Sequence, residues 1–353
     1  MIKFFKRILS FLGILVAAAL LFVLCLTLTE YRPEDRSLAE ISTTSPQQVF
    51  SGQQVRLLSW NTGYAGLGEQ SDFFMDGGKM VDPPSQDNVQ ENMKAIGDYL
   101  SGTEADFYLL QELDRSSSRT DRVDQAAYYE EQTGLPWSYG ANYRCFFVPY
   151  PFPPLGKMDS GIATFSPYQT AKDPIRLSLP CPFTWPIRVA NMKRCVLMNT
   201  YDLEGTDKKL VVVNLHLEAY DDGEGKIAQT KKLFEILEGE YEKGNYVIAG
   251  GDFNQTLPGS LENYPHQGGD LWKPGHLENG ILPEGWQFVY DSSVPTCRSL
   301  DKPYDRSNPN HQFYVLDGFL VSPNVQPTLV ETQDLGFVNS DHNPVRMEAN
   351  LLP

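Results

Sequence analysis

Several apolar, strand-like runs in this sequence end in polar side chains of the types that bind metals and phosphates. One run closes on Asn61, another on Glu112, and a third on Asp252-Phe253-Asn254. Strand ends are where α/β proteins place ligands and catalysts, because the loops that follow are free to carry polar groups. A single residue of this kind is as readily explained by turn chemistry. Two further segments of the same character favour one shared polar site: Val213-Asn214-Leu215-His216-Leu217 and Ser340-Asp341-His342-Asn343-Pro344.

These motifs, in this order, resemble those of the endonuclease/exonuclease/phosphatase superfamily, which includes DNase I-like nucleases, neutral sphingomyelinases and inositol phosphate phosphatases. The resemblance extends over nearly all of residues 55–351. It implies an α/β fold, a DNase I-like four-layer sandwich with two central mixed β-sheets, and metal-dependent hydrolysis of a phosphoester. The matching motifs are Trp60-Asn61, Gln111-Glu112, Asn214-Leu215-His216, Gly251-Asp252-Phe253-Asn254, Leu316-Asp317-Gly318 with Val321-Ser322, and Ser340-Asp341-His342.

The residue types suit that chemistry. Phosphoester hydrolysis needs an activated water, neutralisation of the phosphate oxygens and help for the leaving oxygen. Glu112 is the strongest single candidate metal ligand, because a hard carboxylate suits Mg²⁺, with Mn²⁺ as an alternative. We expect Asn61 to orient Glu112 or to reach the metal through water. The resemblance implies that Asp252 positions or activates the attacking water and that Asn254 donates to the phosphate.

The resemblance also assigns roles to the remaining polar residues. It implies that His342 acts as a base or as a phosphate donor and that Asp317 orients it. A carboxylate beside an imidazole fixes the tautomer and favours the protonated form. Asp341 would add to the metal site, and His216 would be a second imidazole donor to the phosphate.

Departures from the family pattern narrow the substrate, and two of them argue against a role in abasic-site repair. His216 stands where apurinic-site endonucleases typically carry Tyr, and Gly63 stands where an Asp follows their Trp-Asn motif. The Arg that often precedes the Asp317 motif is missing. The pattern therefore favours the DNase-like, sphingomyelinase-like or phosphatase-like branches.

Other polar segments give weaker signals. Residues 114–124 (DRSSSRTDRVD) follow Glu112, and within them Arg119 is our favoured substrate contact, because Arg binds phosphate in a bidentate manner. The alternative is a solvated, salt-bridged loop. The Gly-rich residues 63–78 lack the Lys and spacing of a nucleotide-binding loop, so we expect a long active-site loop there. His266, His276 and His311 lie in loops and are expected at the surface.

The elements that must position these residues alternate in type. Helical periodicity covers residues 86–101 and 225–242, and each helix precedes a β-rich run that ends in an acidic residue. Strands interleaved with helices favour a layered α/β domain. The predicted strands are Val55–Asn61, Phe107–Gln111, Gly161–Phe165, Cys195–Tyr201, Leu210–Leu217, Tyr246–Ala249, Tyr314–Val321 and Pro344–Leu351.

Residues 143–155 (YRCFFVPYPFPPL) combine proline and aromatic residues at a density that argues against a helix or a central strand. We interpret this segment as a rigid loop packed by its own aromatic side chains. The alternative is an amphipathic rim that touches lipid or substrate.

Composition bounds the class of protein. The chain has 353 residues with a formal charge of −16, and a surface this acidic disfavours nucleic acid as a partner without excluding it. Of five cysteines, Cys25 lies in the apolar N-terminal run, and the other four lie far apart and form no CxxC pair, so we expect these four to be small buried thiols, with a Cys181–Cys195 bridge as the lesser alternative. Oligomeric state leaves no signal in the sequence.

The N-terminus predicts a membrane anchor. Lys3, Lys6 and Arg7 precede an uncharged run, residues 8–28, that is long enough to span a bilayer. Basic residues before the run should keep that end in the cytoplasm and place the rest outside. A cleaved signal peptide and a lipidated Cys25 are the alternatives. We therefore predict a single-pass anchor over residues 1–30, a linker over 31–53 and an extracytoplasmic catalytic domain over 54–353.

Three functions compete on this evidence. The first is a membrane-anchored phosphoesterase that acts on a lipid head group or a small phosphoester. The second is an extracellular nuclease with the same chemistry. The third, a catalytically inactive binding module, requires loss of the metal carboxylate or the terminal histidine, and both Glu112 and His342 are present.

Overall fold

The computed structural model describes residues 2–43, 50, 52–221, 223–269, 271–308 and 310–353. Its centre consists of two seven-stranded β-sheets, each of them mixed. The first sheet has the order β1-β7-β8-β9-β10-β16-β13, in which only β9 and β10 are parallel neighbours. Its strands are β1 (Arg36–Leu38), β7 (Ile175–Ser178), β8 (Cys195–Asp202), β9 (Lys209–His216), β10 (Tyr246–Asp252), β16 (Asp317–Val321) and β13 (Gln287–Val289).

The second sheet has the order β17-β18-β3-β4-β6-β5-β2, and its one parallel pair is β3 with β4. Both parallel pairs are central, and both end at the predicted motifs. The strands are β17 (Val325–Thr332), β18 (Val345–Leu351), β3 (Gln54–Asn61), β4 (Phe107–Asp114), β6 (Gly156–Phe165), β5 (Trp137–Val148) and β2 (Glu40–Ile41). Short pairs β11 (Gln255–Thr256) with β12 (Gly275–His276) and β14 (Cys297–Arg298) with β15 (Phe313–Tyr314) lie apart from the sheets.

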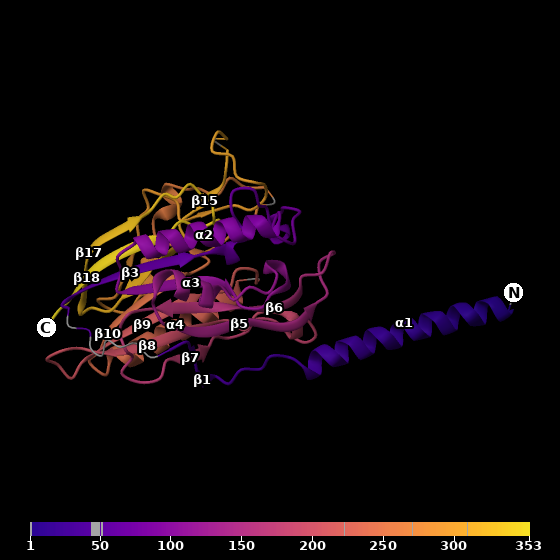
Figure 1. The fold of residues 1–353 in the computed structure, drawn as a ribbon, viewed down its shortest axis with the longest axis horizontal. Helices are drawn as coiled ribbons and strands as arrows, with labels where there is room; N and C mark the ends of the chain where they lie inside the picture. The colour runs from indigo at the N-terminus through magenta and orange to yellow at the C-terminus, as the bar shows by residue number, and fades with distance from the viewer. Residues whose placement is uncertain (1, 44–49, 51, 222, 270, 309) are drawn as a thin grey trace.

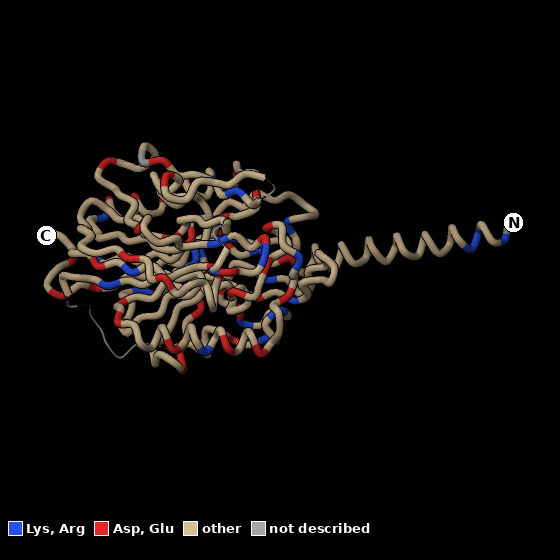
Figure 2. The backbone as a smooth tube through the Cα atoms, turned by 90° about the horizontal axis from the view of Figure 1, so that it is seen from above, with Lys and Arg blue, Asp and Glu red and all other residues tan. Residues whose placement is uncertain are grey.

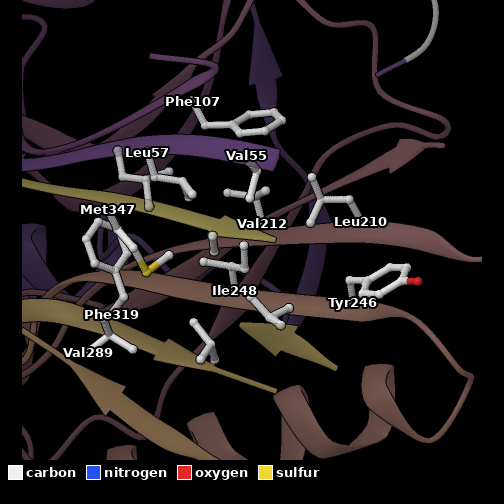
Figure 3. Packing of buried hydrophobic residues seen from close by; sticks show 14 of the residues in the cluster. Val55, Leu57, Phe107, Leu210, Val212, Tyr246, Ile248, Val289, Phe319 and Met347 are labelled. Carbon is white, nitrogen blue, oxygen red and sulfur yellow. The ribbon is translucent and has the colours of Figure 1, made fainter. Parts of the chain in front are cut away.

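The two sheets pack face to face through a largely apolar core. Val55, Leu57 and Phe107 of one sheet meet Val212 and Ile248 of the other, all at most 1% exposed (Figure 3). Alternation along each strand explains this, because every second side chain of a strand points to the same face. Burial of such side chains stabilises the domain by roughly 1.5–3 kcal/mol each.

Helices cover the outer face of each sheet, which completes the four-layer sandwich (Figure 1). Helix α2 (Gln86–Gly102) begins at Ser85, whose hydroxyl accepts a hydrogen bond from the Asn88 amide, and packs with α3 (Gln125–Thr133) on the second sheet. Helix α4 (Glu224–Tyr241) packs on the first sheet through Leu233 and Leu237. The predicted fold is confirmed.

Two predictions about local structure need correction. Residues 36–41, placed in the predicted linker, form β1 and β2 at the sheet edges. Residues 143–148, assigned to a loop, continue β5, and only residues 149–155 connect β5 to β6. The prolines that argued against a strand all follow its last residue.

Helix α1 (Ile2–Leu28) projects from one end of the domain (Figure 1). Its charged residues lie near the N-terminal tip, and the remainder is uncharged (Figure 2). Residues 3–28 are long and apolar enough to cross a membrane, a property that signal sequences share. All five cysteines are free thiols, and Cys181 is exposed whereas Cys195 is buried, so the alternative Cys181–Cys195 bridge is not formed.

Candidate active site

A β-bulge in β4 presents Glu112 to the site. Leu110 pairs with Ala163 and Leu113 with Gly161, so Gln111 and Glu112 together face a single residue of β6. Glu112 adopts a φ of 58°, which is rare for a residue with a side chain. It is also the one residue of β4 that is not buried. The bulge therefore turns this carboxylate out of the sheet at a conformational cost, as functional positions often do.

Asn61, at the end of β3, joins two carboxylates. Its side-chain amide donates to Oε1 of Glu112 at 3.1 Å and to Oδ2 of Asp252 at 3.0 Å. Its Oδ1 accepts a hydrogen bond from the Gly63 amide at 3.0 Å. Because the oxygen is engaged and the nitrogen faces the carboxylates, the geometry matches an orienting role for Asn61 rather than direct metal ligation.

The ends of the parallel strands β9 and β10 bring His216 next to Asp252. The two residues pair in register, and Nε2 of His216 lies 3.4 Å from Oδ2 of Asp252 and 3.8 Å from Oε1 of Glu112. Burial, the Arg194 charge and the His342 charge lower the pKa of His216 well below its ordinary value.

His342 is held by Asp317. Nδ1 of His342 lies 2.8 Å from Oδ2 of Asp317, and Nε2 lies 3.8 Å from Oδ2 of Asp252 and 3.9 Å from Oδ2 of Asp341. Burial opposes protonation, but the Asp317 carboxylate and its neighbours raise the pKa of His342 well above its ordinary value. The Nδ1 contact leaves Nε2 directed at the other carboxylates.

Asp341 lies against the loop that follows β3. A side chain added at Gly63, whose φ is +52°, would come within 2.7 Å of Oδ1 of Asp341, so this close approach requires glycine. Burial, together with the nearby Glu112 charge, raises the pKa of Asp341 to about 6 although the His342 charge opposes the shift. Asp341 thus shares one electrostatic environment with Glu112.

Buried amide contacts fix the two sheets beneath the site. The amide of Gln111 donates to Oδ1 of Asn214 at 2.8 Å, and the amide of Asn214 donates to the carbonyls of Leu110 and Ala163. The indole of Trp60 donates to the carbonyl of His342 at 2.9 Å. Gln111 and Asn214 therefore connect β4 to β9, and Trp60 connects β3 to the loop that carries His342.

Comparisons with known proteins agree with this arrangement. The sequence profile of the endonuclease/exonuclease/phosphatase family matches residues 58–342. The chain belongs to this family. Family members are hydrolases that act on phosphoester bonds. No curated protein matches the chain by sequence.

Solved structures of the endonuclease/exonuclease/phosphatase family share the fold at low identity. An endonuclease/exonuclease/phosphatase from Beutenbergia cavernae is 17% identical with a TM-score of 0.59, over 85% of this chain and 72% of that one. A humanized TDP2 of D. rerio is 17% identical with a TM-score of 0.52, over 85% and 100%. The human Nocturnin catalytic domain with bound sulfate anion is 14% identical with a TM-score of 0.53, over 88% and 96%.

The donor set fits the divalent cation that enzymes of this family typically use. Among the described residues, no Lys or Arg forms an ion pair with Glu112, Asp252, Asp317 or Asp341. Of the two imidazoles beside these four carboxylates, only His342 has a raised pKa. Burial and the Asp317 charge raise the pKa of Asp252 to about 7, and Oδ1 of Asp317 is buried with no hydrogen-bond partner. A cation would relieve this excess of negative charge.

Asn254, two residues after Asp252, adopts a backbone conformation that is uncommon for a residue with a side chain. Its φ is 50°, its backbone amide donates to Oδ1 of Asp252, and its side-chain amide donates to the carbonyl of Leu217 at 2.9 Å. One amide hydrogen of the side chain is therefore engaged within the protein, and the second is available to a phosphate.

Arg119 is the one predicted site residue that the structure places in a different role. Its Nε and one terminal nitrogen donate to the two oxygens of Asp114, each at 2.9 Å, and its guanidinium lies 3.3 Å from the centre of the Tyr64 ring. It is 6% exposed. The guanidinium is thus committed to a buried ion pair beside the active-site loop, and we do not retain Arg119 as a substrate contact.

Sequence reasoning missed Asp76 and Tyr220 beside the site. The Tyr220 hydroxyl donates to Oδ1 of Asp76 at 2.8 Å. Burial raises the pKa of Asp76 to about 7, and the Asp341 and Glu112 charges add to this effect, which places Asp76 within the same electrostatic field. The expected active-site loop, residues 63–78, contains Asp76, but nothing in its spacing singles out this residue. His311, expected at the surface, is 2% exposed.

Proposed function

We propose that this protein hydrolyses the phosphoester of a lipid head group in the membrane that anchors it, with Mg²⁺ or Mn²⁺ bound at the site. Membership of a phosphoesterase family supports the reaction, and the position of the site relative to α1 supports the substrate. We further propose that α1 stays in the mature protein and that the domain faces outward.

The observation that carries this proposal is that the site and α1 share one end of the domain. The C-terminus lies at the opposite end from α1 (Figures 1 and 2), and Asn350 of β18 pairs with Gln54 of β3. Since β3 runs antiparallel to β18, Asn61 lies toward α1. Likewise, the Tyr246 hydroxyl at the start of β10 bonds to the carbonyl of Leu352, so Asp252 lies toward α1.

The proposed division of labour follows from the contacts. Glu112 and Asp341 hold the cation, which supplies Lewis-acid stabilisation of the phosphate oxygens when it is bound. Asn61 fixes Glu112 and Asp252 relative to each other. Asp252 accepts a proton from the attacking water.

The imidazoles and the remaining amide face the phosphate. His342, oriented by Asp317, presents Nε2 as a hydrogen-bond donor to the phosphate or the leaving oxygen. His216, at the end of β9, and Asn254, just after β10, supply further hydrogen-bond donors to the phosphate.

A nuclease is the second candidate, because the same chemistry cleaves nucleic acids and the family includes nucleases. The formal charge of −16 counts against it, since phosphate-backbone binding depends on Lys and Arg.

A substrate panel tests the proposal. The full-length chain in detergent micelles is incubated with sphingomyelin, phosphoinositides, plasmid DNA and nucleotides, with Mg²⁺, with Mn²⁺ or with chelator. We expect metal-dependent release of a lipid head group, and at least 100-fold slower release by Glu112→Gln, on the order of the loss that removal of a catalytic group causes. Cleavage of DNA with no lipid hydrolysis would establish the nuclease instead.

A further inference from the structure

Two segments of the domain pack around the last turns of α1. The Phe22 ring meets the Phe147 ring edge-on, with centroids 6.1 Å apart, and the Trp185 indole donates to the Thr27 hydroxyl at 3.1 Å. Leu26 is buried in the same cluster as Val148 of β5. The end of β5 and the 3₁₀ turn η4 (Ile187–Ala190) therefore flank the helix where it meets the domain, and the β5–β6 connection follows directly on β5.

These segments carry an exposed apolar surface, which we call the aromatic collar: Phe146, Tyr150, Phe152, Trp185 and Ile187. Their exposed fractions run from 44% for Phe146 to 95% for Phe152. Among the described residues outside α1, all four aromatic side chains classed as exposed belong to the collar. A cluster of this kind is not the scatter of single apolar residues that ordinary surfaces show.

The collar lies at the depth where a bilayer ends. The uncharged stretch from Ile8 to Thr29 spans roughly 33 Å as a helix, close to the thickness of about 30 Å for a hydrocarbon core. The collar residue Trp185 contacts this helix at Thr27, near its outer end. Trp and Tyr concentrate at this boundary because their rings combine an apolar body with a polar edge.

Cations gather at the same level. Arg32, Arg188 and Lys193 surround the carboxylate of Glu30, at 2.9, 3.0 and 3.5 Å, so three cations meet one carboxylate at this point. Lipid phosphates attract such residues at a membrane surface.

The collar also continues to the active site. The Tyr150 ring contacts the Phe74 ring, with centroids 6.1 Å apart, and Phe74 begins the short helix η2 (Phe74–Asp76), which ends at the Asp76 carboxylate beside the site. A membrane that touches the collar therefore lies next to the loop that borders the catalytic carboxylates.

We propose that the aromatic collar inserts into the head-group layer of the anchoring membrane and holds the active-site loop against the lipid surface. The proposal rests on the proposed function in treating α1 as a membrane-spanning helix. Continuity with that helix, together with the cations at its outer end, identifies a phospholipid bilayer as the occupant of this surface.

Tryptophan quenching tests the contact directly. Helix α1 contains no Trp, Trp60, Trp137 and Trp286 are buried, and Trp272 is partly buried. The full-length chain is reconstituted into phosphatidylcholine vesicles that carry bromine at carbons 6 and 7 of one acyl chain. We expect quenching in the wild type that Trp185→Phe largely removes. Equal fractional quenching in the two proteins would overturn the proposal.

Activity provides the second arm. Phe152→Ser should lower turnover of lipid in vesicles by about fivefold or more, while turnover of a soluble chromogenic phosphodiester stays unchanged. Ile227→Ser is the matched control, because Ile227 is 69% exposed on α4, outside the collar. Equal losses on both substrates, or in both variants, would refute a membrane contact. If Trp185 is quenched but the wild type hydrolyses no lipid, the proposed substrate fails and the collar stands.

Discussion

Glu112 and His342 each depend on one neighbour for their orientation. The β-bulge in β4 and the Asn61 amide orient the Glu112 side chain. The Asp317 carboxylate orients the His342 imidazole. Such supporting residues commonly matter almost as much as the groups that they orient.

Substitutions of Glu112 and His342 should lower activity more than substitution of Asp317, which only orients His342. We expect Glu112→Gln and His342→Ala to lower kcat/KM by roughly 10²–10⁴-fold, and Asp317→Asn by roughly 10–100-fold, because the imidazole remains but loses its charged partner. Steady-state kinetics with Mg²⁺ checks this, with thermal unfolding as the control for folding. Full activity in His342→Ala would reject its assignment.

The raised pKa of Asp76 should make the free energy of unfolding depend on pH. Its pKa rises from 3.8 to about 7 on folding, mainly through burial. The folded state therefore binds more protons between these values, and stability falls as the pH rises through this window. In the presence of chelator, the unfolding free energy of the wild type should therefore fall between pH 5.5 and pH 8.0. In Asp76→Asn this fall should be smaller by on the order of 1–2 kcal/mol.

Chemical denaturation at the two pH values measures this difference. Asparagine keeps an oxygen that can accept the Tyr220 hydroxyl, so the variant tests the charge rather than the hydrogen bond. An identical pH dependence in the two proteins would mean that Asp76 titrates normally.

The sequence predicts most of the residues that the structure brings together here, because they lie at or near the ends of strands and their motifs recur in the family order. It does not predict Arg119 correctly, since nothing in the run from 114 to 124 shows that both oxygens of Asp114 bind one edge of the guanidinium. It also does not reveal Asp76, which enters the site through the path of a loop rather than through a periodic element.

At the scale of elements, the end of β10 depends on the backbone freedom of Gly251. Its φ is +150°, and a Cβ at this position would lie 1.9 Å from the carbonyl oxygen of Leu215 on β9. Gly251→Ala should therefore destabilise the domain by about 1–3 kcal/mol and lower activity, because Asp252 follows directly.

Gly239→Ala is the matched control for that prediction. Gly239 lies in α4 with no neighbour within 4 Å of an added Cβ, so alanine should leave stability unchanged or raise it by roughly 0.5–1 kcal/mol. Urea unfolding of both variants gives the comparison. Similar stabilities for the two would show that β10 relaxes around the added methyl group.

Central elements follow from the sequence more readily than edge elements do. Strands such as β9 and β10 are continuous apolar runs because both of their faces are covered. Strand β5 was missed in its first half because Trp137–Asn142 mixes small, polar and aromatic residues, and in its second half because prolines follow closely. Strands β1 and β2 are too short to show any period.

At the scale of the whole molecule, the proposed topology makes the domain accessible from outside the cell. Cys181 is an exposed thiol of the folded domain, whereas Cys145, Cys195 and Cys297 are buried and Cys25 lies within α1. A membrane-impermeant maleimide should therefore label intact cells that express the full chain, and Cys181→Ser should abolish the label.

The same experiment distinguishes the alternatives for the N-terminus. Retention of α1 predicts that the labelled protein sediments with membranes and has the mass of the full chain, because the helix is not removed. A labelled protein of lower mass in the medium would establish a cleaved signal sequence. Labelling only after permeabilisation would place the domain in the cytoplasm and reverse the proposed orientation, since the reagent cannot cross the bilayer. The reagent reports on one native cysteine, so no substitution in the active site or the collar is needed to read the topology.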